Sequence, residues 1–114
     1  MKEEIKAYNN ILDLIGNTPL ISIAKIANTL PGNYFAKVEA FNPGHSSKDR
    51  IALYIIEEAE RLGILKPGDT IIETTSGNTG FSVAMVSIIK GYDCILAVTS
   101  KSSKDKIEML SAMG

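Results

Sequence analysis

The sequence predicts an α/β fold built on an open parallel sheet with helices on both faces. Two observations lead to this prediction. From residue 34 onward, segments with the character of strands take turns with segments whose apolar residues recur at helical spacing. Hydrophobic residues make up 45% of the 114 residues and charged residues 22%, values that are ordinary for a globular domain, or part of one, and exclude a disordered chain.

The first 40 residues are expected to contain two short strands. A turn at 16–20 leads into an alternating strand at 21–23. A second turn at 31–33, with the sequence Pro-Gly-Asn, precedes a strand at 34–39. This second strand opens the regular alternation of strands and helices.

The middle of the chain is expected to form a helix, a strand and a second helix. Apolar residues between 51 and 62 fall on one helical face, so we expect a helix that begins at Asp49 and ends before Gly63. A strand follows at 70–74. The segment 78–90 is apolar nearly all round, which is typical of a buried helix.

The last 20 residues continue the alternation. The apolar run at 94–98 is typical of an interior parallel strand, and we expect Cys94 to be a core residue of it rather than a nucleophile. Ser102 and Asp105 form a pattern like a capping box at the start of a last helix. The inner face of that helix is expected to carry Ile107, Leu110 and Met113.

Composition excludes several classes of function. The net charge is −1 and no apolar run reaches the roughly 18 residues of a membrane span, so neither a nucleic-acid partner nor a membrane is expected. Residues 1–6 are charged and lack the apolar stretch of a signal peptide. Cys94 is the only cysteine, so no intrachain disulfide can form. These features favour a cytoplasmic protein, and no metal site is expected.

Two loops lie where such a fold binds ligands. Ligands of open parallel sheets bind beyond the carboxyl ends of the strands. The loops 42–48 and 74–80 follow two of those ends, and both contain glycine and several polar residues. We therefore expect the functional residues in these two loops.

Lys48 stands at the expected start of a helix, beside Asp49 and Arg50. One interpretation is that the lysine extends into water and that Asp49 offsets its charge, since a cation at this end opposes the helix dipole by about 0.3–1 kcal/mol. The other is that the helix end, Arg50 and burial lower the lysine pKa and give the neutral amine that reacts with an aldehyde. The residues alone favour the first interpretation, because lysines near helix starts are common.

The loop 74–80 is typical of an anion site. Backbone N–H groups at a helix start attract negative charge, and the two glycines allow a ligand to approach closely. Four side chains add hydroxyl or amide donors: Thr75, Ser76, Asn78 and Thr79. The alternative is a helix cap by Ser76 or Asn78, but one cap does not require four such residues. The residues do not say whether the anion is a phosphate or a carboxylate.

Three segments together resemble one enzyme family. Residues 42–50 resemble the motif N-P-G-G-S-x-K-D-R of the cysteine synthase and cystathionine β-synthase family, and residues 75–80 match its T-S-G-N-T-G loop without a change. Residues 14–20 resemble its I-G-N-T-P-L signature. The three motifs occur in the family's order and at similar spacing.

The resemblance implies the type II fold of pyridoxal-phosphate enzymes, of which residues 1–114 would be an incomplete, N-terminal part of the catalytic core. It implies that Lys48 carries pyridoxal 5′-phosphate and acts as acid and base at the α-carbon of an amino-acid substrate. The implied reaction is β-replacement, in which a serine-like amino acid loses its β-substituent to a sulfur nucleophile. The substrate α-carboxylate would be bound by Thr75, Ser76, Asn78 and Thr79, and Asn78 would also bond the cofactor's 3′-oxygen.

The resemblance leaves several alternatives open. The sequence does not distinguish cysteine synthesis from cystathionine synthesis, and a related lyase or dehydratase activity is a further alternative. His45 stands where a glycine is common in the family, and it either touches the substrate or lies partly in solvent. The cofactor-phosphate loop of the family lies beyond the matched region, and a homodimer is expected for the full-length protein. A non-catalytic truncated homologue is the alternative function; an unrelated phosphate-binding domain would not explain Lys48 together with the loop 75–80.

Overall fold

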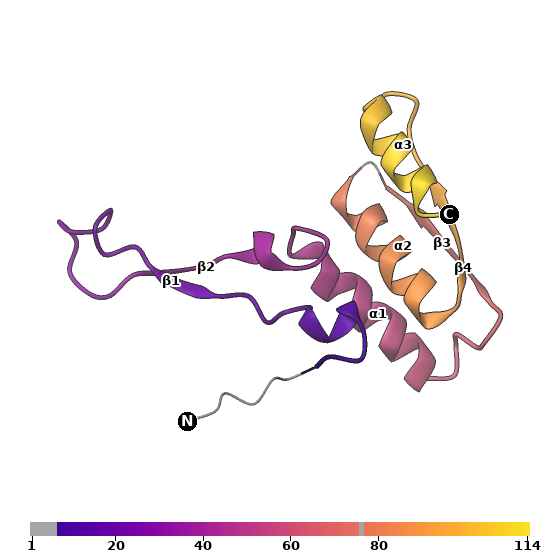
Figure 1. Cartoon of the computed structure of the whole chain (residues 1–114), viewed down its shortest axis with the longest axis horizontal. Coiled ribbons are helices and arrows are strands. Elements are labelled where there is room, and N and C mark those ends of the chain that lie inside the picture. The colour runs from indigo at the N-terminus through magenta and orange to yellow at the C-terminus, as the bar shows by residue number, and fades with distance from the viewer. Residues whose placement is uncertain (1–6, 76) are drawn as a thin grey trace.

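The structure is a computed structural model that describes residues 7–75 and 77–114 (Figure 1). The chain alternates helices and strands after residue 47, as the sequence predicted. The described elements are η1 (Ile11–Leu14), β1 (Leu20–Ser22), β2 (Phe35–Lys37), η2 (Glu39–Phe41), α1 (Lys48–Arg61), β3 (Thr70–Thr74), α2 (Asn78–Lys90), β4 (Asp93–Ala97) and α3 (Lys104–Ala112).

The strands form two small sheets. β3 and β4 pair in parallel, with Thr70 opposite Asp93 and Thr74 opposite Ala97, so the carboxyl ends of both strands lie at the same edge. β1 and β2 pair antiparallel in a separate hairpin. The predicted strand 34–39 therefore does not join the parallel sheet. No helix lies between β1 and β2, and strands without a crossover between them pair antiparallel.

Helix α2 covers one face of the parallel sheet. Side chains on that face of β3 and β4, such as Ile71 and Leu96, are half-buried against the core. On the opposite face Ile72 is 69% exposed and Ile95 is 55% exposed. Helical cover was predicted on both faces; in the described residues it is present on one, and large apolar side chains of the other face stay mostly exposed.

The buried core lies between α1, α2 and the 3-10 turn η1. Its members are Leu12, Ala52, Ile56, Val83, Val86 and Tyr92. At the far end of the helix pair, the Lys90 Nζ and Glu60 Oε2 atoms are 2.9 Å apart, and the Tyr92 hydroxyl donates to Glu60 Oε1 at 2.9 Å. Cys94 is half-buried against this core, as predicted, and burial raises the pKa of its thiol.

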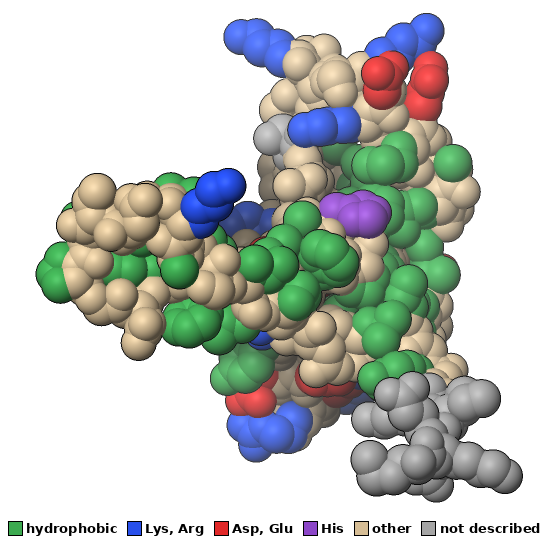
Figure 2. Space-filling view, turned by 60° about the vertical axis from the view of Figure 1, so that its left-hand side comes forward, with side chains coloured by type: hydrophobic (Ala, Val, Ile, Leu, Met, Phe, Trp, Pro, Cys, Tyr) green, Lys and Arg blue, Asp and Glu red, His purple; other side chains and the backbone are tan. Residues whose placement is uncertain are grey.

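The molecule is extended for its length. Its radius of gyration is 17.6 Å, whereas a compact chain of this length has about 13 Å. The β1–β2 hairpin projects away from the helices in Figure 1, and Figure 2 shows hydrophobic side chains over much of the surface around the single histidine. No helix of the described residues has the length and apolar character needed to cross a membrane.

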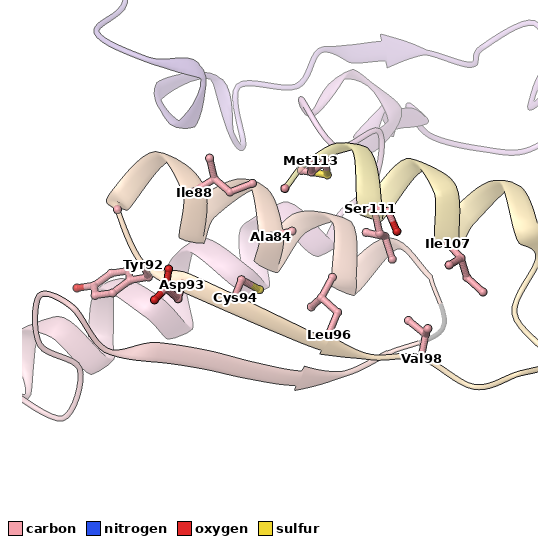
Figure 3. A pocket seen from close by; sticks show the side chains of 13 residues that line it. Ala84, Ile88, Tyr92, Asp93, Cys94, Leu96, Val98, Ile107, Ser111 and Met113 are labelled. Atoms are coloured by element: carbon pink, nitrogen blue, oxygen red, sulfur yellow. The ribbon is translucent and has the colours of Figure 1, made fainter.

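A cavity of about 520 Å³ lies between α2, β4 and α3 (Figure 3). Its lining is mainly apolar and includes Ala84, Ile88, Leu96, Ile107 and Met113. A second hollow of about 160 Å³ lies between α1, β3 and α2, and Thr79 lines it. Neither cavity is lined by Lys48.

Candidate functional site

Lys48 is the first residue of α1, and its side chain is exposed. The burial of Lys48 that one interpretation of the sequence required is thus absent from this part of the fold. His45, three residues earlier, has a φ of 61°, which is uncommon for a residue other than glycine. Its side chain is exposed, and its Nδ1 atom lies 3.3 Å from the Ala40 carbonyl oxygen.

Asp49 joins the Lys48 loop to helix α2. The carboxylate is fully buried; it accepts the Gly44 N–H at 2.6 Å on Oδ2 and the Ser82 hydroxyl at 2.5 Å on Oδ1. A Cβ on Gly44 would lie 2.2 Å from Asp49 Oδ1, so glycine is required there. In one interpretation of the sequence, Asp49 offsets the Lys48 charge in solvent. The structure instead buries it between the two helices.

The start of α2 is capped in a way that the sequence did not predict. The N-cap residue is Gly77, which provides no side-chain bond, and Asn78 is the first helical residue. The Thr75 Oγ1 atom accepts the N–H of Gly77 at 3.3 Å and that of Gly80 at 3.1 Å. Asn78 is therefore not the cap, and its side chain is exposed, whereas Thr79 is half-buried. The prediction for Ser76 lies outside the described residues.

The two loops lie at the same end of the α1–α2 pair. The Ser82 Oγ atom bonds Asp49 and also lies 3.0 Å from the Asn78 carbonyl oxygen, so the first turns of both helices are joined. The helices run side by side from this end (Figure 1). Lys48, Thr75, Asn78 and Thr79 all stand at or beside these first turns.

A second lysine approaches the same end. The Lys106 Nζ atom lies 3.8 Å from the position that a Cβ on Gly77 would take. Its positive charge adds to the partial charge of the helix N-terminus and favours an anion there. The sequence reasoning missed Lys106, because it belongs to α3, about 30 residues after the loop. Only the fold brings α3 back to the start of α2.

Arg50 points to a different part of the molecule. Its Nε atom bonds Glu39 Oε2 at 2.9 Å, and its Nη2 atom bonds the Gly16 carbonyl at 3.0 Å. The buried Asn42 completes this cluster by accepting the Gly16 N–H at 2.8 Å. The Arg50 hydrogen bonds lower the pKa of Glu39 from 4.5 to about 2. The Arg50 charge is thus paired with Glu39.

This cluster joins the motif at 14–20 to the motif at 42–50. Gly16 and Thr18 lie in the segment 14–20, and Asn42 and Arg50 lie in the segment 42–50. Their hydrogen bonds fix the N-terminal segment against the loop before α1. These two motifs thus include residues that hold the chain's own segments together.

Comparison with known proteins decides the family. A family model described as "Pyridoxal-phosphate dependent enzyme" matches residues 11–114. The chain belongs to this family. It is 51% identical over 111 residues to cystathionine beta-synthase of Mus musculus, and 43% identical over 106 residues to cysteine synthase 1 of Emericella nidulans. The predicted family, the α/β fold with a parallel sheet and the cofactor are confirmed.

A solved structure shows the same arrangement. A hydrogen sulfide-producing enzyme from Fusobacterium nucleatum matches with a TM-score of 0.85 and 43% sequence identity. The match covers 96% of this chain and 36% of that one. The matches to the mouse and Emericella enzymes cover 96% and 93% of this chain, but only 20% and 29% of those proteins. The chain thus spans about a fifth to a third of the length of these relatives.

The residues present fit a pyridoxal-phosphate cofactor. Lys48 is exposed, so the aldehyde of the cofactor can reach its amine. At the same end of the helix pair lie the Asn78 amide, the half-buried Thr79, and a helix start without a side-chain cap on its N-cap residue. This donor set suits a carboxylate or another anion.

Proposed function

We propose that the protein carrying this chain performs pyridoxal-phosphate-dependent β-replacement on a serine-like amino acid. Residues 1–114 form the N-terminal part of its catalytic core, and the product is a sulfur amino acid. The observation that carries the proposal is the link from Asp49 through Ser82 to Asn78, because it holds the lysine loop and the anion loop at one end of the helix pair. A homodimer in the cytoplasm is part of the proposal.

Each residue has a distinct task in this function. Lys48 binds the cofactor covalently and moves a proton at the substrate α-carbon. The bound cofactor supplies an electron sink. Asn78 donates its amide to the cofactor's 3′-oxygen and to the substrate α-carboxylate. Ser76 and Thr79 donate their hydroxyl hydrogens to that carboxylate.

Thr75 can contribute although its oxygen is already used. Its Oγ1 atom accepts two backbone N–H groups. A hydroxyl has one hydrogen to donate in addition to its two lone pairs. The Thr75 hydrogen is thus available for the α-carboxylate, and the two accepted bonds fix the direction in which it is donated.

The assignment of Lys48 is tested by chemical trapping. The intact protein is reduced with borohydride in the presence of the cofactor and digested, and the labelled peptide is sequenced. We expect the label on Lys48 and no visible cofactor absorption in K48A. Lys37, whose amine donates to the Thr18 carbonyl at 2.7 Å, and the exposed Lys66 serve as controls. Label on either control lysine would exclude the proposed role.

The choice of sulfur nucleophile is a separate measurement. Relatives of this chain carry both names, cystathionine beta-synthase and cysteine synthase. The intact protein is given L-serine or O-acetyl-L-serine together with sulfide or homocysteine, and the products are separated. Cysteine or cystathionine is the expected product. A protein that traps the cofactor on Lys48 but forms neither product would support the non-catalytic alternative.

A further inference from the structure

We propose that Asp49 is a positioning residue that acts through Ser82 to hold the Lys48 loop in register with the Asn78 loop. The inference rests on the proposed function, because it concerns how the lysine and the carboxylate-binding residues keep their relative place. It gives a role to Asp49 and Ser82, two buried residues that have no part in binding the cofactor or the substrate in the proposed function.

The surroundings of Asp49 are unusual for a carboxylate. It is 0% exposed, and its neighbours in the described chain form no ion pair with it. Its bonds come from a backbone N–H and a serine hydroxyl. A buried polar group of this kind stabilises a fold less than an apolar pair of the same shape would. What it provides instead is direction, because each hydrogen bond is confined to a narrow range of distance and angle.

The two hydrogen bonds of Asp49 hold the two segments that carry the candidate site residues. One carboxylate oxygen holds Gly44, which lies in the loop that leads into Lys48. The other holds Ser82, one turn into α2. The absence of a side chain on Gly44 lets the loop approach the carboxylate this closely. A movement of either loop relative to the other would have to break one of these two bonds.

Ser82 carries the link on to the anion loop. Its Oγ atom lies 2.5 Å from Asp49 Oδ1 and 3.0 Å from the Asn78 carbonyl oxygen. A single hydroxyl hydrogen can be donated to only one of these two oxygens. The carboxylate oxygen of Asp49 is the nearer acceptor by 0.5 Å and therefore takes it. The serine is thereby held against Asp49, while the first turn of α2 stays in contact with it.

Ser87 provides a matched control for Ser82. Both serines are 0% exposed and lie on the same helix. The Ser87 hydroxyl donates to the Val83 carbonyl at 2.7 Å, a bond within the helix that involves neither loop. S82A and S87A thus remove the same atom from the same kind of environment, and only the first cuts the link between the loops.

The experiment compares S82A, S87A, S82T and D49N in the intact protein with cofactor. The absorption change on adding L-serine gives the affinity for the amino acid, and the pH dependence of the absorption reports the surroundings of Lys48. We expect S82A to weaken L-serine binding about tenfold and to move the pH profile, with S82T restoring both. D49N should act in the same direction, because an amide offers one acceptor oxygen in place of two. S87A should match the wild type in both readouts.

Two results would overturn the inference. One is an equal loss of L-serine affinity in S82A and S87A, which would make the effect one of helix stability. The other is a normal affinity for L-serine and a normal pH profile in S82A. This result would be decisive even if D49N does not fold. A wild-type protein without cofactor absorption would instead refute the proposed function and is recognised before any variant is made.

Discussion

Single residues of the site divide into those already bonded within the protein and those left exposed. Asp49 and Asn42 are buried, and their polar groups are bonded to the chain itself. Lys48 and Asn78 are exposed at the same end of the helix pair. The division explains how one motif can include both buried and exposed polar residues. The buried ones fix the backbone, and the exposed ones are accessible to a ligand.

Thr79 provides a test of the proposed carboxylate site. T79A should leave the visible absorption of the bound cofactor unchanged and weaken L-serine binding, because a hydrogen bond to a charged group contributes about 1.5–3 kcal/mol. Spectral titration with L-serine measures the change. T70A, at the exposed opposite end of β3, is the matched control and should bind L-serine normally. Loss of the cofactor with normal L-serine affinity would indicate a phosphate site instead.

His45 should show the energetic effect of its backbone conformation. Its φ of 61° is a region where a side chain costs about 1–2 kcal/mol and glycine costs little. We expect H45G to be more stable than H45A by about 1 kcal/mol in denaturant unfolding of the intact protein. Comparing the two variants removes the contribution of the imidazole. Equal stabilities would mean that the loop changes conformation when the histidine is replaced.

At the scale of elements, the α1–α2 pair is joined by polar bonds at both ends and by apolar contacts between them. Asp49 and Ser82 join the N-terminal ends, and Glu60 joins Lys90 and Tyr92 at the other. Hydrogen bonds to Lys90 and Tyr92 lower the pKa of Glu60, with Lys90 the largest cause. Sliding of one helix along the other would therefore break bonds at both ends.

The Glu39–Arg50 pair should make stability depend on pH. Because the pKa of Glu39 falls from 4.5 to about 2 in the folded state, its contribution is fully present above pH 4.5 and is lost as the pH falls to 2. We expect the unfolding free energy of E39Q to depend less on pH over this range than that of the wild type. R50Q should have the same effect, since it removes the cause of the shift. A wild-type slope in both variants would contradict this account.

The sequence predicted the elements better than their ends and pairings. Gly63 and Gly91 do follow α1 and α2 with positive φ, because a left-handed residue at a helix end has a local signature. The last helix is capped by Ser103 rather than Ser102, since the two neighbouring serines look alike in sequence. The pairing of β2 with β1 could not be predicted from alternation, which does not encode partners.

For the candidate site, the sequence motifs identified residues but not the contacts between them. The motifs identified Lys48 and the loop 75–80, and the structure places both at the same end of the helix pair. Asp49 and Lys106 were not recognised, because burial and contacts across 29 to 33 residues of sequence are properties of the fold. A buried aspartate and an exposed one look the same in a sequence.

At the scale of the whole molecule, this chain has more surface than a compact protein of its mass. Its accessible surface is 8353 Å², whereas a folded protein of this mass has about 6,100 Å². Large apolar residues contribute to the excess, among them Ile64, Ile72 and Ile95. Surfaces of this kind usually pack against further protein.

The isolated 114 residues should therefore not behave as a stable enzyme. Each Å² of apolar surface left in water forgoes roughly 25 cal/mol, and a domain has only about 5–15 kcal/mol of stability in total. We expect residues 1–114, expressed alone, to bind a hydrophobic dye, to unfold without a sharp thermal transition and to show no β-replacement. A cooperative transition together with tight stoichiometric cofactor binding would contradict this prediction.

The projecting β1–β2 hairpin is expected to be the first site of limited proteolysis. Each strand has three residues, and Ile26 in the connecting segment is 83% exposed. A segment with so few buried contacts opens locally at little cost in free energy, and proteases cut chains that open. Lys25 lies exposed in that segment, whereas Lys90 is held by two glutamates. Brief trypsin treatment should cleave after Lys25 well before Lys90, and the helix pair should survive the first cut.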